Sequence, residues 1–124
     1  MNTHDRLSKV RLRDLSGNVA AISPAELNRK LENGEIVKLI EVSEPDEFRQ
    51  GHINGSINVH LGSAVLVAAS LYRPYEQLAV YAPKASSIAG QAAARELQKS
   101  GFQNVLVLTG GKEAWRKNGF LLVD

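Results

Sequence analysis

The residues with the clearest chemical potential lie in a loop between a predicted strand and a predicted helix. The apolar stretch 78–81 predicts a short buried strand, and the Ala-rich stretch 88–99 predicts a helix. In such a loop, successive backbone N–H groups and the positive N-terminal end of the helix attract anions. A lysine adds a full charge and two serines add hydroxyl donors. The sequence therefore predicts an anion-binding loop made of Ala82, Pro83, Lys84, Ala85, Ser86, Ser87 and Ile88.

The polar residues of this loop also have a purely structural interpretation. Lys84 can be an exposed loop lysine without a ligand, and Ser86 and Ser87 can cap the helix that follows. The two roles of the serines are compatible, because an N-cap also orients the amides that bind an anion.

The loop lacks a nucleophile at its first position. A loop of this kind lowers the pKa of a thiol placed there, but the residue after Val80 and Tyr81 is Ala82, and the chain contains no cysteine. The hydroxyls of Ser86 and Ser87 are weak nucleophiles, and no base is placed to activate them. As written, the chain is therefore expected not to be an enzyme.

Length and composition are those of one globular domain. The 124 residues are 44% hydrophobic and 23% charged, with a net charge of +2 and a pI of 9.0. The basic residues crowd only between residues 6 and 13, where acidic neighbours dilute them, so no nucleic-acid partner is expected. The first residues are polar, and no apolar run approaches the roughly 18 residues of a membrane span. We therefore expect a cytoplasmic protein that does not bind membranes.

The histidines and the absence of cysteine argue against bound metals. His4, His52 and His60 are widely spaced, whereas the ligands of a zinc site usually cluster in the sequence. Disulfides and thiolate metal sites are excluded. We expect no metal and no cofactor.

The elements that must position the loop alternate between strand and helix. Residues 1–20 are expected to form a helical arm or a tail, and residues 21–124 the domain. Strands are predicted at residues 36–42, 78–81 and 104–108, and a turn that feeds a short strand at 53–59. Helices are predicted from residue 24 to about 33, from 43 to before 51, at 64–71 and 88–99, and after residues 110–111 up to 118. The helix 64–71 is expected to be buried. This alternation predicts an α/β fold with a doubly wound parallel sheet, whose ligands bind beyond the carboxyl ends of the strands.

Three motifs carry a resemblance to a known family. Residues 39–48 (LIEVSEPDEF), 51–58 (GHINGSIN) and 110–115 (GGKEAW) resemble the "LIDVREPxEF", "GHIPGAIN" and "GGxxAW" motifs of the rhodanese homology domain, in the same order. The resemblance covers about residues 22–123. It implies a five-stranded parallel sheet between helices and a sulfurtransferase ancestry, in which a loop cysteine accepts sulfur as a persulfide.

The chain departs from this family where its chemistry resides. The strand 78–81 aligns the family cysteine with Ala82, and counting back from Gly101 aligns it with Lys84 instead. The usual Asp and Arg of the first motif are Glu41 and Ser43, so a buried pairing that supports the site is lost or rebuilt. His52, in the second motif, is expected to be a structural turn histidine. An arginine common in the family's loop is missing.

These observations predict a rhodanese-like domain that acts as a non-catalytic binding or regulatory module. Its expected partner is a small oxyanion or a sulfur-carrying protein, and the sequence does not define an oligomeric state. One alternative is a thiosulfate or persulfide sulfurtransferase in which the cysteine at position 82 has been replaced by Ala82. A second alternative is a protein-docking module without an anion ligand.

Overall fold

The computed structural model describes residues 19–124. The expected N-terminal arm therefore lies outside the described residues, except for its last two positions. Ala20, which was assigned to the arm, already belongs to the first strand of the domain.

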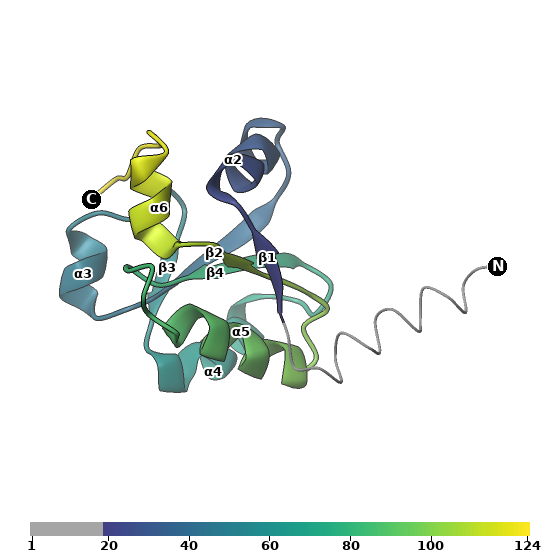
Figure 1. Cartoon of the computed structure of the whole chain (residues 1–124). Helices are drawn as coiled ribbons and strands as arrows, with labels where there is room; N and C mark the ends of the chain where they lie inside the picture. Colours follow the sequence, from purple (N-terminus) through teal and green to yellow (C-terminus); the bar gives the residue numbers. More distant parts are fainter. Residues whose placement is uncertain (1–18) are drawn as a thin grey trace.

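Five strands alternate with helices along the chain (Figure 1). In chain order the elements are β1 (Ala20–Ile22), α2 (Pro24–Glu32), β2 (Val37–Val42), α3 (Pro45–Arg49), β3 (Ile57–Val59), the short 3₁₀ turn η1 (Leu61–Ser63), α4 (Ala64–Leu71), β4 (Gln77–Tyr81), α5 (Ala89–Lys99), β5 (Asn104–Leu108) and α6 (Gly111–Lys117).

The strands form one parallel sheet in the order β1-β5-β4-β2-β3. Every pairing is parallel; in the centre Glu41 lies opposite Tyr81, and Val80 lies opposite Val107. Helices α4 and α5 cover one face, and α2 and α6 lie on the other (Figure 1). This confirms the predicted doubly wound five-stranded sheet. Because all carboxyl ends point the same way, the loop after β4 lies at the edge where ligands bind in such folds.

The near-continuous apolar character of β2 follows from its burial on both faces. Leu39 packs with Leu27 and Trp115 on the side of α2 and α6, whereas Ile40 packs with Leu97 on the side of α4 and α5. Side chains alternate across a strand, so consecutive apolar residues serve both cores. Trp115, the last residue of the third motif, is buried in this core and only 4% exposed.

The helix starts follow from local capping. Ser23 accepts a hydrogen bond from the Glu26 N–H at 3.1 Å, and the Glu26 carboxylate accepts one from the Ser23 N–H at 3.1 Å, so the two residues form a capping box at the start of α2. At α3 the cap is Glu44 rather than Ser43: the Glu44 N–H donates to the Glu47 carboxylate at 3.1 Å. Ser43 is thereby freed for a different contact, described below.

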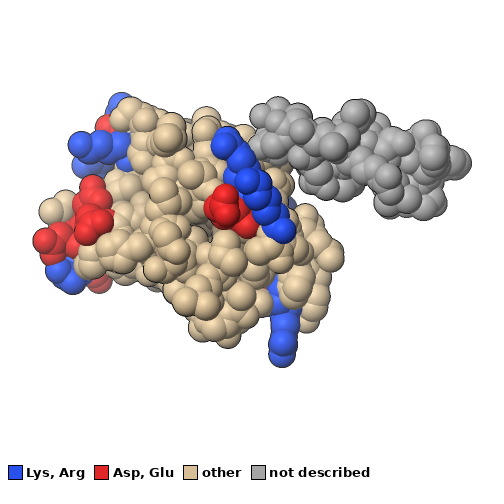
Figure 2. Space-filling view, turned by 90° about the horizontal axis from the view of Figure 1, so that it is seen from below, with Lys and Arg blue, Asp and Glu red and all other residues tan. Residues whose placement is uncertain are grey.

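The expectation that residues 64–71 form a buried helix is wrong in one respect. The helix exists, but only Ala64 and Ala68 are buried, while Leu66 is 76% and Leu71 is 56% exposed. Figure 2, which views the face of α4 and α5, shows few charged side chains there. In residues 19–124, no helix has the length and apolar character needed to cross a membrane.

Candidate functional site

The loop between β4 and α5 is fastened to the start of α6. The backbone N–H of Lys112 donates to the carbonyl of Ala82 at 2.9 Å, and the N–H of Glu113 donates to the carbonyl of Pro83 at 3.1 Å. Gly111 makes this approach possible: it has φ +66°, and a Cβ at this position would collide with the Ala82 carbonyl. The Gly-Gly of the third motif therefore serves the loop directly.

Only some of the loop amides are available for a ligand. The N–H of Ala85 donates to the Glu113 carboxylate at 3.0 Å, the N–H of Ser87 to the Lys84 carbonyl at 3.1 Å, and the N–H of Ala89 to the Ser87 hydroxyl at 3.2 Å. Within residues 19–124, the N–H groups of Lys84, Ser86 and Ile88 have no such partner. Free donors thus alternate with occupied ones along the loop.

Glu113 is a built-in anion beside the loop. Its hydrogen bond from the Ala85 N–H holds the pKa of its carboxyl below the ordinary value, and the charges of Lys117, Arg116 and Lys84 act in the same direction. A carboxylate already occupies one of the donors that an incoming anion would use.

Ala82 presents only a methyl group at the start of the loop. It is 4% exposed, and Gly90 of α5 packs so closely that a Cβ there would lie 3.4 Å from the Ala82 nitrogen. The Ser87 hydroxyl accepts a hydrogen bond from the Ala89 N–H at the start of α5, but the N-cap position is Ile88 and carries no side-chain capping hydrogen bond. Ile88, 75% exposed, is the residue before the first turn.

Three hollows border the loop within the described part of the chain. The Arg95 pocket, about 460 Å³, lies between the loop, α5 and the strands β1 and β5. The Glu44 pocket, about 320 Å³, lies between the loop, α3 and the residues after β3. The Arg116 hollow, about 280 Å³, lies between the loop, α3 and α6. Lys84 borders all three.

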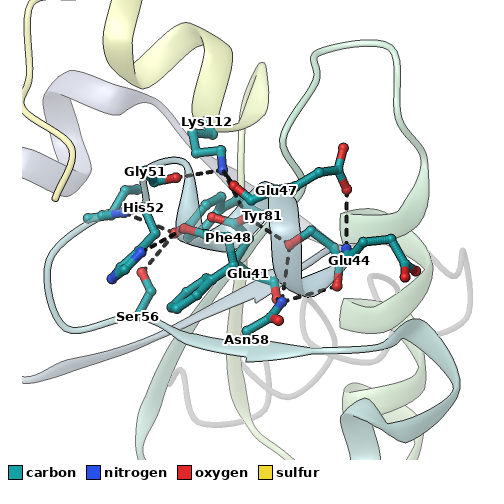
Figure 3. A network of polar contacts seen from close by, with 12 residues as sticks. Glu41, Glu44, Glu47, Phe48, Gly51, His52, Ser56, Asn58, Tyr81 and Lys112 are labelled. Atoms are coloured by element: carbon teal, nitrogen blue, oxygen red, sulfur yellow. Dashed lines mark hydrogen bonds and ion pairs between the residues drawn. The ribbon is translucent and has the colours of Figure 1, made fainter. Parts of the chain in front are cut away.

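Behind the loop lies a buried ion pair. Glu41, fully buried at the end of β2, accepts a hydrogen bond from the Lys112 ammonium at 2.9 Å; Lys112 comes from α6 (Figure 3). Lys112 also donates to the carbonyls of Glu47 at 2.9 Å and Gly51 at 2.6 Å, which uses its three donors. The pairing at these family positions is therefore rebuilt, with Lys112 as the cation.

Ser43 completes this arrangement. Its hydroxyl donates to the same Glu41 oxygen, Oε2, at 2.7 Å, and accepts from the Asn58 amide at 3.1 Å. The other carboxylate oxygen of Glu41 is buried without a hydrogen-bond partner in residues 19–124. Lys112 and Ser43 thus compensate one side of the buried charge, and the other side stays unsatisfied.

Tyr81 and His52 support the neighbouring turn. The Tyr81 hydroxyl accepts from the Ile53 N–H at 3.1 Å and lies 2.8 Å from the Ser56 hydroxyl, while burial and the charge of Glu41 raise its pKa far above the ordinary value. His52 stacks on Phe48 with 3.7 Å between ring centroids, and its Nδ1 lies 2.9 Å from the Phe48 carbonyl. These contacts fit the expected structural role of His52.

Sequence reasoning missed three residues of this region: Lys112, Glu113 and Arg95. Lys112 and Glu113 stand in the "xx" positions of the third motif, where the family pattern specifies no residue type. Arg95 lies on a helix surface with other charged residues and carries no distinguishing pattern. The sequence indicated only that some cation is needed, because a buried Glu41 requires one and the family Arg is absent at position 43; it did not indicate which residue supplies it.

Comparisons with known proteins agree with the fold and the motifs. Residues 23–118 match the family described as rhodanese-like domain. The chain is 33% identical over 104 residues to the thiosulfate sulfurtransferase GlpE of Pseudomonas aeruginosa, covering 82% of this chain and 88% of that protein. It is 30% identical over 111 residues to the uncharacterized protein YibN of Escherichia coli, covering 90% of this chain and 77% of that protein.

A solved structure shows the same architecture. The solution structure of the rhodanese-like domain of an Anabaena protein superposes with a TM-score of 0.75 at 25% sequence identity, covering 83% of this chain and 77% of that chain. The parallel sheet, the loop after β4 and the matched segment together define the class. This chain belongs to the rhodanese-like domain family.

Proposed function

We propose that this protein is a non-catalytic rhodanese-like domain that binds a small oxyanion, or the anionic group of a sulfur-carrying partner, at the loop 82–88. The observation that carries the proposal is the combination of an anchored loop with Ala82 at its first position. The carbonyls of Ala82 and Pro83 are held by α6, while the methyl of Ala82 offers no acceptor for sulfur.

The loop keeps the means to bind an anion without the means to react with it. The N–H groups of Lys84, Ser86 and Ile88 lack partners within residues 19–124, and Lys84 borders every hollow around the loop. Backbone donors next to the N-terminus of α5 favour negative charge. A role in sulfur metabolism is part of the proposal, supported by the relative named as a thiosulfate sulfurtransferase.

The proposed compartment is the cytoplasm.

Titration with sulfate and with thiosulfate tests anion binding. We expect the amide resonances of residues 84–88 to shift saturably, and the Lys84→Ala variant to bind more weakly. Arg49→Ala, which removes an exposed cation on α3, is the matched control and should leave the titration unchanged. Shifts spread evenly over the molecule, or none at all, would contradict the proposal.

A second experiment tests the absence of catalysis. The protein should transfer no sulfur from thiosulfate to cyanide above the rate without protein, because no thiol is present to form a persulfide. Turnover that survives rigorous purification would refute this.

The alternative function is sulfur transfer, with cysteine at position 82 in place of Ala82. The similarity to GlpE favours it. The departures from the family motif at Glu41 and Ser43 favour a non-catalytic domain. A single substitution at position 82 would have left the family residues at positions 41 and 43 unchanged. The Ala82→Cys variant separates the two: efficient turnover in this variant would support the alternative.

The docking alternative predicts a different titration. A protein-docking module without an anion ligand would show no response of the loop to sulfate. In that case the exposed leucines of α4 are the surface to examine.

A further inference from the structure

The Arg95 pocket differs from the other two hollows in its charge. Its lining contains two cations, Arg95 and Lys84, and no aspartate or glutamate. The Glu44 pocket contains Glu44 and Glu47 beside Lys84 and His60. The Arg116 hollow contains Glu47 and Glu113 beside Lys84, Lys112 and Arg116, of which Lys112 is already paired with Glu41. Of the three hollows that share Lys84, the Arg95 pocket therefore offers the most favourable potential to an anion.

Neither cation of this pocket takes part in a direct ion pair among the described residues. Within residues 19–124, neither Arg95 nor Lys84 lies within 4.0 Å of a carboxylate. The neighbouring Glu96 pairs instead with Lys99 at 3.6 Å. The guanidinium of Arg95 is thus available, and its planar fork suits an oxyanion.

The rest of the pocket combines an apolar wall with the polar side chains of Ser87, Gln91 and Thr109. Val19 and Ala21 come from the edge of the sheet, and Val107 from the neighbouring strand β5. Val19 and Val107 also pack against the core under α4 and α5. A volume of about 460 Å³ lies within the range of small-molecule sites, which combine an apolar surface with a few polar groups. A bare inorganic ion would fill only a small part of it.

We propose that the Arg95 pocket binds a small organic oxyanion: an apolar body that packs on Val19 and Val107, with a sulfonate, phosphate or carboxylate head held by Arg95 and Lys84. This deepens the proposed function, on which it rests for the role of Lys84. It assigns the ligand to the side of α5, β1 and β5, away from the carboxylates of α3. It also assigns Arg95 as the residue that recognises the head group.

The probe for this proposal is 4-toluenesulfonate, titrated against the full chain by calorimetry and by amide shifts. The Arg95→Gln variant should bind it at least tenfold more weakly, which is about the loss of one charge-assisted hydrogen-bond pair. Lys99→Gln removes a cation from the same helix outside the pocket and should change the affinity less than twofold. Both side chains are exposed, so both variants should fold. The uncharged 4-toluenesulfonamide should bind the unchanged protein at least tenfold more weakly.

The apolar part of the site has its own test. Ala21→Leu places a larger side chain in the pocket without changing any charge; it should weaken 4-toluenesulfonate and leave inorganic sulfate unaffected. Equal affinity in the unchanged protein and in Arg95→Gln, equal losses in Arg95→Gln and Lys99→Gln, or no binding of the probe would each overturn the assignment.

Different results would refute the anion-binding function of the loop and the ligand assignment of the Arg95 pocket. If sulfate shifts the amides of residues 84–88 but Arg95→Gln does not affect 4-toluenesulfonate, the loop function stands and the Arg95 pocket is refuted. If the probe binds in an Arg95-dependent manner while sulfate leaves the loop unchanged, the pocket stands and the loop function is refuted.

Discussion

The ammonium of Lys112 lies 2.9 Å from the carboxylate of Glu41, joining residues that are 71 positions apart. Glu41 is fully buried, and the Lys112 side chain is 12% exposed. This pair connects the end of β2 to the first turn of α6, the same turn whose amides hold the loop carbonyls of Ala82 and Pro83. The position of the loop therefore depends on a buried charge and its partner.

The first prediction concerns this pair. Lys112→Met should lower the free energy of unfolding by about 3–5 kcal/mol, because it leaves the buried Glu41 charge uncompensated. Lys117→Met, on the exposed side of the same helix, is the control and should change it by less than about 0.5 kcal/mol. Urea unfolding measures both.

A second variant separates charge from packing. Glu41→Gln combined with Lys112→Met removes both charges and should be less destabilising than Lys112→Met alone. Equal urea midpoints for Lys112→Met and Lys117→Met would show that the pair contributes nothing.

The sequence indicated that residues 41 and 43 matter for the site, but it did not predict the contact between Glu41 and Lys112. Glu41 and Ser43 stood out because they depart from a motif, and the burial of residue 41 follows from the apolar run around it. The position of Lys112 could not be derived, because a lysine in the first turn of a helix is normally solvated, and its contact with Glu41 depends on how α6 packs against the sheet.

The sequence analysis also missed strand β1 and the exposed face of helix α4, for other reasons. Strand β1 has three residues, Ala20–Ile22, which are too few to show a period. In α4 all but one residue is apolar, so no polar side chain marks the face that is exposed. The central strands were predicted well because their runs of β-branched and apolar residues are typical of strands buried on both faces.

The second prediction concerns the approach of the loop to α6. Gly111 and Gly119 both have positive φ, +66° and +85°, but only at Gly111 would a Cβ meet the Ala82 carbonyl, whereas at Gly119 nothing lies within 4 Å. Gly119→Ala should therefore cost only the strain of the left-handed backbone, about 1–2 kcal/mol. Gly111→Ala should cost more and should also shift the amide resonances of residues 82–85. Equal losses, with the loop resonances unmoved, would contradict the contact.

The third prediction is a pH dependence. The pKa of the Glu113 carboxyl is lowered from its ordinary value of 4.5, chiefly by the Ala85 N–H. When folding lowers the pKa of a carboxyl group, its ionised form stabilises the folded state at pH values above the pKa of the unfolded state. This contribution is lost as the pH falls through the pKa of the folded state. The tether between Ala85 and Glu113 should therefore persist down to pH 4.5 and release below it.

The Ala85 amide resonance, followed from pH 7 to pH 3, measures this release. Glu113→Gln should remove the transition at Ala85. Glu26→Gln, which alters another carboxyl whose pKa is lowered by a backbone hydrogen bond, should leave it unchanged. A transition at Ala85 with its midpoint above 4.5 would show that the carboxylate is not held by this N–H.

The last prediction concerns a thiol placed at the start of the loop by Ala82→Cys. Lys84 and the N-terminal end of α5 stabilise a thiolate there and lower its pKa. The burial of position 82, which is 4% exposed as Ala82, and the nearby Glu113 carboxylate act in the opposite direction. We expect the donors to prevail and the pKa to lie below the free value of about 8.5. Glu113→Gln in the same background should lower it further, because it removes the competing negative charge.

The pH dependence of alkylation by iodoacetamide measures this pKa. Ser70→Cys is the matched control, because Ser70 is exposed near the C-terminal end of α4, where the helix dipole disfavours a thiolate. If the thiol at position 82 titrates at or above the control, the loop amides do not stabilise an anion, and the proposed binding function loses its physical basis. If it titrates lower and Glu113→Gln lowers it again, then Glu113 sets how readily this loop accepts an external anion.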